Sequence, residues 1–223
     1  RAVVRAKVDC VRYTQGHPAS VSQAARHLGI ALEHLRHGTV RLVVVGGAPG
    51  TGKSTLARAL AGPLDATVLS TDDIRAAMAA AGEISGAPGT LGAGLYRPEN
   101  VAAVYDAVLD RAGHTLARGR SVILDGTWGD PRQRDRVRAL AAQSACPLTE
   151  LVCTAPLADA VTRIQTRTAT TSQVTPQIAT ALVAGDDWGP AHWPQAHRVD
   201  TTTPPAETLA AALDICRNPH PAD

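Results

Sequence analysis

The chain of 223 residues has no phenylalanine, a single methionine, three tyrosines and three tryptophans. Its hydrophobic core must therefore be built mainly from alanine, valine, leucine and isoleucine. No apolar run approaches the about 20 residues that a membrane-spanning helix needs, and the sequence shows no signal-peptide pattern. We therefore expect a cytoplasmic protein that does not associate with a membrane.

The rest of the composition excludes several further classes. With 44% hydrophobic and 19% charged residues, the chain is not a disordered segment or a collagen-like repeat. The net charge of +2 is too small to indicate a nucleic-acid partner. The cysteines lack CxxC spacing, so we expect reduced thiols and neither a zinc site nor a disulfide scaffold; they are Cys10, Cys146, Cys153 and Cys216.

Lysine is also scarce. Of the 22 basic residues, only Lys7 and Lys53 are lysines. Lys53 lies within a glycine-rich segment, in a chain that otherwise uses arginine almost exclusively. This pattern indicates that position 53 needs an ammonium group and not merely a positive charge.

The first part of the chain is predicted to be a separate helical segment, residues 1–39. Residues 2–38 have helical periodicity, with a capping box at Ser20–Gln23 and Gly38 as a helix end. One helix face is expected to carry Ala24, Leu28, Leu32 and Leu35. Because the chain begins with Arg1 and not methionine, we interpret this segment as a linker or the tail of a preceding domain.

From residue 40 onwards, strand and helix patterns alternate. Short apolar runs typical of buried parallel strands occur at 42–45, 66–69 and 122–124, with weaker candidates at 148–153 and 197–199. The clearest helix begins at Pro98 and ends at Gly119. This alternation predicts a three-layer α/β/α domain over residues 40–223, with a mainly parallel five-stranded sheet between two layers of helices.

One motif carries most of the chemical information. It matches GxxxxGK[ST], the P-loop pattern, over residues 47–54, follows the 42–45 strand directly and precedes a helical segment. The α/β domain is therefore predicted to have the three-layer α/β/α P-loop NTPase fold. Its glycines allow backbone N–H groups to surround phosphate oxygens, and the helix N-terminus adds partial positive charge. We predict that a nucleoside triphosphate, ATP, is bound by Gly47, Ala48, Pro49, Gly50, Thr51, Gly52, Lys53, Ser54 and Thr55.

Acidic residues follow two other predicted strands. Asp72 and Asp73 come after the 66–69 strand, and Arg75 lies one helical turn beyond Asp72. We predict that Asp72, in preference to Asp73, accepts a proton from an acceptor hydroxyl and that Arg75 positions the acceptor. The alternative is that both carboxylates cap the helix.

Asp125 ends the 122–124 strand and is interpreted as the carboxylate of a Mg²⁺ site shared with Ser54. The alternative is a turn or N-cap residue. Two further arginines, Arg163 and Arg167, are spaced to share one helix face and are predicted to stabilise the transferred phosphoryl group. Their alternative is a solvated basic face.

Other features favour a structural interpretation. The arginines at 132, 134, 136 and 138 scatter around a helix, which argues against a nucleic-acid stripe. Trp188 and Trp193 lie near prolines, and packing in a turn is favoured over base stacking. Two polar or glycine-rich stretches, 82–94 and 166–176, are predicted to be mobile loops over the ligand, with plain surface insertions as the alternative.

The segments GGAPGTGKST, STDDIR and VILDGTW, followed by an R-x-x-x-R helix, resemble P-loop kinases of the polynucleotide-kinase and zeta-toxin-like group, often described as AAA-domain ATP-binding proteins. The resemblance covers about residues 40–215. It implies that Asp72 is the acceptor-side base, that Arg75 follows it in the acceptor site, and that Arg163 and Arg167 are lid arginines. The segment RAVVRAKVDCVRYTQG resembles the tail of an aminoglycoside-phosphotransferase-like domain.

These observations predict an ATP- and Mg²⁺-dependent phosphotransferase, a kinase that acts on a hydroxyl of a small molecule. Three alternatives stay open. The first is a nucleotide-sensing module that regulates a fused partner domain. The second is a polynucleotide 5′-hydroxyl kinase, and the third is an ATPase that acts without an acceptor.

Overall fold

The computed structural model describes residues 1–87, 92–166 and 192–218. Its contacts divide the chain into two units, Arg1–Thr39 and Val40–Asp223. The first unit consists of helices α1 (Ala2–Thr14) and α2 (Ser20–Gly38), which pack against each other. Small buried side chains, among them Ala6, Ala24 and Ala31, line the contact, and His27 Nδ1 lies 2.8 Å from Asp9 Oδ2.

One local prediction for the first unit is wrong. The capping box does not form, because Ala19 is the N-cap residue and has no side-chain bond, while Ser20 is already helical. The Ser20 amide is bonded to His17 O in the preceding turn, so the helical path starts earlier than the sequence pattern indicated. Of the residues predicted to share an apolar face, Ala24 is buried, whereas Leu28, Leu32 and Leu35 are 59%, 47% and 67% exposed.

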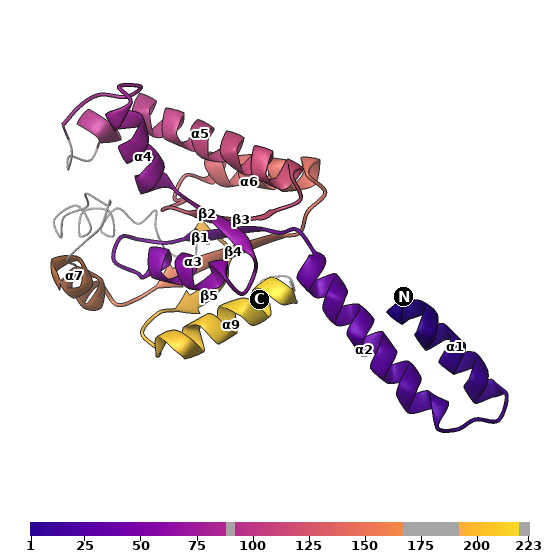
Figure 1. The fold of residues 1–223 in the computed structure, drawn as a ribbon. Helices are drawn as coiled ribbons and strands as arrows, with labels where there is room; N and C mark the ends of the chain where they lie inside the picture. The colour runs from indigo at the N-terminus through magenta and orange to yellow at the C-terminus, as the bar shows by residue number, and fades with distance from the viewer. Residues whose placement is uncertain (88–91, 167–191, 219–223) are drawn as a thin grey trace. The chain divides into compact units, whose positions relative to one another are not determined.

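The second unit alternates strands and helices as the sequence predicts (Figure 1). Its strands are β1 (Leu42–Gly46), β2 (Ala66–Ser70), β3 (Ser121–Asp125), β4 (Leu148–Thr154) and β5 (His197–Asp200). Its helices are α3 (Lys53–Ala61), α4 (Thr71–Ala80), α5 (Pro98–Ala117), α6 (Pro131–Gln143), α7 (Leu157–Thr166) and α9 (Pro205–Arg217), with a 3₁₀ turn, η1 (Gly94–Tyr96), before α5.

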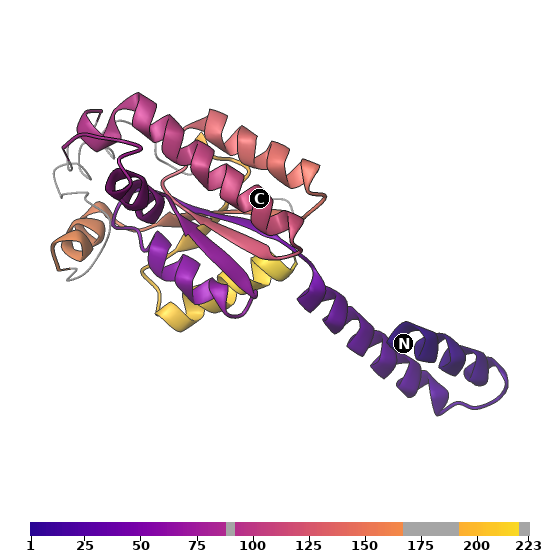
Figure 2. The ribbon, with the colours of Figure 1, turned by 45° about the horizontal axis from the view of Figure 1, so that its top comes forward.

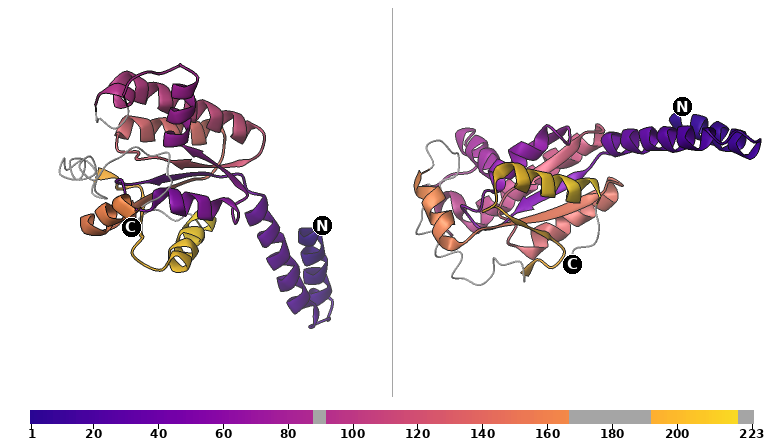
Figure 3. Two further views of the ribbon diagram at one scale, coloured as in Figure 1. Left: turned by 60° about the vertical axis from the view of Figure 1, so that its left-hand side comes forward. Right: turned by 90° about the horizontal axis from the view of Figure 1, so that it is seen from below.

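The five strands form one parallel sheet in the order β2-β3-β1-β4-β5. Helices α5 and α6 cover one face, and α3 and α9 cover the other (Figures 2 and 3). Strand β1 contributes to both layers, because Leu42 and Val44 join the core under α5 whereas Val43 and Val45 join the core under α3. The three-layer α/β/α prediction is therefore confirmed.

The topology places the P-loop strand at the centre of the sheet. Strand β3 lies directly beside β1, and β2 lies on the far side of β3. In register, Asp125 pairs with Val45 on one side and with Ser70 on the other. Since the carboxyl ends of parallel strands form the ligand crevice of such folds, the segments after β1, β3 and β2 meet at one edge.

All four cysteines are free thiols. Burial raises the pKa of Cys153 and Cys216 to about 12, so these two thiols are poor nucleophiles at neutral pH. Among the described residues, no helix combines the length and hydrophobicity that crossing a membrane requires.

Candidate phosphate- and acceptor-binding site

The loop between β1 and α3 has a backbone that only glycine allows at two positions. Gly47 has a φ of +129°, and a Cβ atom there would lie 2.4 Å from the carbonyl oxygen of Cys153. Gly50 has a φ of +79°, and its Cβ would lie 2.4 Å from the carbonyl oxygen of Ala160. The loop is therefore packed closely between β4 and α7, in the tight form that backbone phosphate binding requires.

Lys53 is the first residue of α3 and folds back over this loop. Its Nζ donates to the carbonyl oxygen of Ala48 at 2.8 Å, and the Thr51 hydroxyl donates to the same oxygen at 2.8 Å. The N-terminal amides of α3 add partial positive charge at the same place. The ammonium group and the helix end thus face the loop together, which is the arrangement that favours a polyphosphate.

Ser54 and Asp125 lie next to each other, as predicted for a magnesium site. The Ser54 hydroxyl donates a hydrogen bond to the Asp125 carboxylate, which is 3% exposed. Burial raises the pKa of Asp125, and this effect outweighs the opposing hydrogen bond from Ser54 and the charge of Lys53. A buried carboxylate beside a hydroxyl supplies the hard oxygen ligands that Mg²⁺ prefers, so these residues fit the ion.

Asp72 and Arg75 form an ion pair at the start of α4, with Arg75 Nη1 2.5 Å from Asp72 Oδ1. The Arg75 guanidinium lies over the Tyr96 ring, 4.4 Å from its centroid. The capping alternative does not describe Asp72, because the N-cap residue of α4 is Ser70 and Asp72 is bonded to Arg75. Asp73 is exposed to solvent, whereas Asp72 is within electrostatic reach of Asp125.

Three residues on this side were missed by the sequence analysis. The Tyr105 hydroxyl lies 3.3 Å from Thr127 Oγ1 and accepts from the Trp128 amide at 3.4 Å, and its ring meets the Trp128 ring edge-on at 4.9 Å. Burial raises the pKa of Tyr105, on which the charges of Arg75 and Asp72 also act. Tyr105 is distant in sequence from the motifs, and only Thr127 and Trp128, which closely follow Asp125, could have been suspected.

Arg163 lies on the P-loop side of the site. It donates to the hydroxyl and the carbonyl oxygen of Thr201 at 3.0 and 2.8 Å, and the Thr201 hydroxyl donates to Thr51 O at 2.8 Å. Thr201 was also missed, because nothing in the sequence links the residue after β5 to the P-loop. Arg167, Trp188 and the stretch 167–176 lie outside the described residues, so the role predicted for Arg167 stays a prediction.

The predicted glycine-rich loop is held at both described ends. Asn100, near the start of α5, donates from Nδ2 to Ser85 O at 3.1 Å and to Gly94 O at 2.9 Å. The Leu95 amide donates to Ala87 O at 3.1 Å. Residues 88–91, the centre of this loop, lie outside the described part of the chain.

Three of the α6 arginines, Arg134, Arg136 and Arg138, make side-chain contacts within the domain. Arg136 pairs with Asp106, and Arg138 pairs with both Asp135 and Glu150. Arg134 is buried against backbone carbonyl groups. Trp193 is buried as well, with its Nε1 bonded to Glu150 at 2.9 Å, so it packs inside the domain.

The fold and the glycine-rich loop between β1 and α3 define a P-loop α/β protein. A family model described as an AAA domain matches residues 42–182, more than half of the chain. The chain therefore belongs to the AAA domain family.

Curated relatives with high similarity are longer than this chain. An uncharacterized protein of Mycobacterium tuberculosis, Rv2004c, is 48% identical over 98% of this chain, and the match spans 43% of the relative. An uncharacterized protein of Mycobacterium bovis, Mb2027c, matches to the same extent. The chain thus spans less than half the length of these relatives. None of the comparisons supports the expected aminoglycoside-phosphotransferase-like tail.

Similar solved structures include several kinases. A sugar kinase from Janibacter sp. HTCC2649 has a TM-score of 0.57 and 20% identity, covering 78% of this chain and 93% of its own. A gluconokinase from Sinorhizobium meliloti 1021 has a TM-score of 0.56 and 17% identity, covering 82% and 96%. The Mycobacterium tuberculosis APS kinase CysC, solved with AMPPNP and APS, has a TM-score of 0.58 and 17% identity, covering 79% and 97%. At these identities the likeness establishes a shared fold.

Proposed function

We propose that this protein is a kinase that uses ATP and Mg²⁺ to phosphorylate a hydroxyl group of a small molecule, within the polynucleotide-kinase and zeta-toxin-like group of P-loop kinases. The observation that carries the proposal is the placement of Asp125 between two adjacent strand ends. Beside it on one side is the P-loop strand, and on the other is the strand that leads to Asp72 and Arg75. A triphosphate site next to a carboxylate–guanidinium pair suits transfer to an acceptor better than hydrolysis alone.

In this proposal the nucleotide is bound by residues of the P-loop and of the segments beside it. Lys53 moves from Ala48 O to the β- and γ-phosphate oxygens, and the loop amides bind the same anion. Bound Mg²⁺ would neutralise developing charge on the phosphate oxygens, with Ser54 and Asp125 as the residues that hold it. Arg163 is assigned to the nucleotide side of the site, where it is bonded to Thr201.

On the acceptor side, Arg75 orients the acceptor while Asp72 accepts the proton of its hydroxyl. The hydroxyl oxygen forms a bond to the γ-phosphorus, the bond between that phosphorus and the β–γ bridging oxygen breaks, and ADP leaves. General-base assistance of this kind contributes typically about 10²–10⁴-fold to the rate.

The test is transfer of labelled phosphate from γ-labelled ATP to a panel of sugars, nucleotide sugars, aminoglycosides and oligonucleotides. We expect label in one class of small hydroxyl compound. Label in oligonucleotides, with strong salt dependence, would instead identify a polynucleotide kinase. Acceptor-independent phosphate release would indicate an ATPase, and ATP binding without any turnover would indicate a regulatory nucleotide-binding module.

A further inference from the structure

The loop Gly126–Asp130, here called the β3–α6 loop, contacts both halves of the candidate site. The amide of Gly47, in the P-loop, donates to Thr127 O at 3.1 Å. At the other half, a Cβ atom on Gly126 would lie 2.8 Å from Thr71 Cγ2, so this loop packs directly on the residue before Asp72. The position of the β3–α6 loop therefore sets the spacing between the phosphate side and the acceptor side.

This loop contains a conformation that needs support. Trp128 has a φ of +55°, the left-handed region that bulky residues rarely adopt, and its side chain is fully buried. Such a backbone persists only where the surroundings hold it in place. One support is Tyr105, whose hydroxyl accepts from the Trp128 amide.

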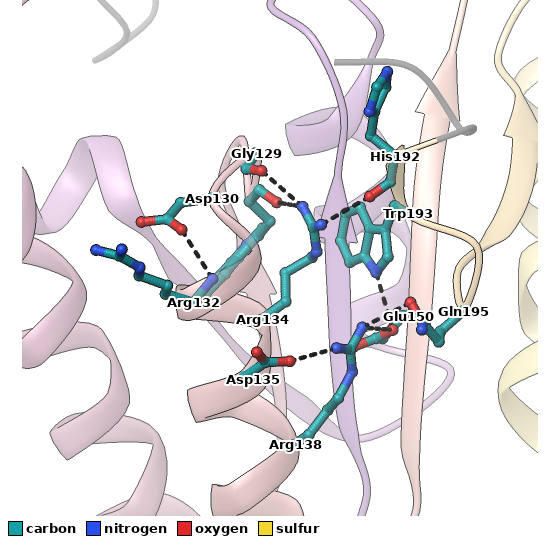
Figure 4. A network of polar contacts seen from close by, with 11 residues as sticks. Gly129, Asp130, Arg132, Arg134, Asp135, Arg138, Glu150, His192, Trp193 and Gln195 are labelled. Carbon is teal, nitrogen blue, oxygen red and sulfur yellow. Dashed lines mark hydrogen bonds and ion pairs between the residues drawn. The ribbon is translucent and has the colours of Figure 1, made fainter. Parts of the chain in front are cut away.

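Arg134 provides the other support, from the first turns of α6. Its Nη1 donates to the carbonyl oxygens of Trp128 and Gly129, both at 2.8 Å, and its Nη2 donates to His192 O at 2.8 Å (Figure 4). The side chain is 6% exposed. All three acceptors are backbone groups, so Arg134 fixes the path of the chain at the strained residue and just after it.

The same guanidinium also supports the end of β1, through the ring of Trp193. It lies 5.0 Å from the centroid of the Trp193 ring, whose Nε1 is bonded to Glu150. This ring also covers Gly46, where a Cβ atom would lie 2.3 Å from Trp193 Cζ3. Arg134 thus supports Gly46–Gly47 by two routes, one through the β3–α6 loop and one through Trp193.

We infer that Arg134 is a positioning residue for phosphoryl transfer, an inference that rests on the proposed function. It touches neither reactant and acts by aligning the P-loop with the Asp72 side of the site. Lysine cannot replace it fully, because one ammonium group lacks the planar fork that reaches three carbonyl oxygens. A misplacement of about 1 Å between reacting groups can cost about 10²-fold in rate, so loss of this brace should lower kcat above all.

The experiment compares Arg134→Gln and Arg134→Lys with Arg136→Gln in the full chain. Arg136 is the matched control, because it lies on the same helix in an exposed ion pair with Asp106. We expect kcat to fall about 100-fold in Arg134→Gln and about 10-fold in Arg134→Lys, with the acceptor KM and the ATP dissociation constant within about threefold of wild type. Arg136→Gln should keep the wild-type kcat.

A second measurement does not depend on catalysis. Hydrogen–deuterium exchange should be faster in the Arg134 variants in peptides that cover the P-loop and the β3–α6 loop, and unchanged in Arg136→Gln. If the wild-type protein transfers no phosphate, the proposed function fails, while this comparison still decides whether Arg134 holds the P-loop and the β3–α6 loop in place. A folded Arg134→Gln protein with the kcat and exchange of the control overturns the inference. Failure of both Arg134 variants to fold overturns it too, since the role would then be purely structural.

Discussion

Replacing Arg138 by methionine is expected to destabilise the second unit far more than replacing its neighbour Arg136. Arg138 donates from Nε to Glu150 Oε1 at 3.0 Å and from Nη2 to Oε2 at 2.9 Å. Glu150 lies on the buried strand β4 and its side chain is 5% exposed, whereas that of Arg138 is 31% exposed. Without Arg138, the carboxylate keeps one described partner, the indole N–H of Trp193.

The magnitude follows from this burial. Breaking a fully buried ion pair by removing one partner costs about 3–5 kcal/mol, and the partial exposure of Arg138 lets water replace some of the lost bonds. We therefore expect a loss of about 2–3 kcal/mol, or about 4–12 °C in Tm for a unit of this size. The pair Arg136–Asp106 has side chains 44% and 63% exposed, and its loss should cost less than about 1 kcal/mol.

The assay is thermal and urea unfolding followed by circular dichroism for Arg138→Met, Arg136→Met and the wild type. Adding Glu150→Leu to Arg138→Met should restore part of the stability, because it removes the unpaired buried charge. Restoration should stay incomplete, since the Trp193 N–H then lacks its acceptor. Equal losses in the two arginine variants would refute the reasoning that burial decides the energy of these pairs.

Three further outcomes follow from the site. Asp72→Asn should retain ATP binding in a fluorescence titration and lose at least about 10²-fold in transfer rate; wild-type turnover would remove Asp72 from the mechanism. Asp125→Asn should have a higher Tm than wild type at pH 7 without Mg²⁺. The pKa of Asp125 is higher in the folded protein than in the unfolded chain, so the folded protein holds this proton more tightly. The wild type therefore loses stability as the pH rises from the pKa of Asp125 in the unfolded chain to its pKa in the folded protein. The advantage of the variant should therefore disappear in acid, and a constant difference in Tm across pH would contradict this. Gly50→Ala should destabilise the protein by about 1–3 kcal/mol, measured by urea unfolding, because its Cβ would overlap Ala160 O; an unchanged midpoint would count against such close packing of the P-loop on α7.

The sequence predicted the sheet and the motifs well for a physical reason. Strands β1 and β3 are buried on both faces and appear in the sequence as short continuous apolar runs. All five predicted segments are strands, and the edge strand β5, with one buried residue, has the weaker pattern. The P-loop and the Asp72–Arg75 pair are local in sequence, so spacing alone places their side chains together. The Ser20 capping box failed because Ser20 lies after a turn that had already started the helix.

The rest of the site depends on contacts between distant segments. Thr201 reaches Thr51 across 150 residues, and Trp193 reaches Glu150 across 43. No local pattern encodes such pairs. Arg134 is an exception that could have been recognised, since it shares helical spacing with the buried Val137 and Ala141 and so belongs on the inner face of α6.

The most direct test of the central claim is calorimetric titration of the protein with ATP in the presence of Mg²⁺, repeated with AMP and with Lys53→Met. The account predicts saturable binding of ATP, much weaker binding of AMP, and loss of ATP binding in the variant, because the loop and the lysine recognise the phosphate chain. Equal binding of ATP and AMP, or undiminished ATP binding by Lys53→Met, would contradict it.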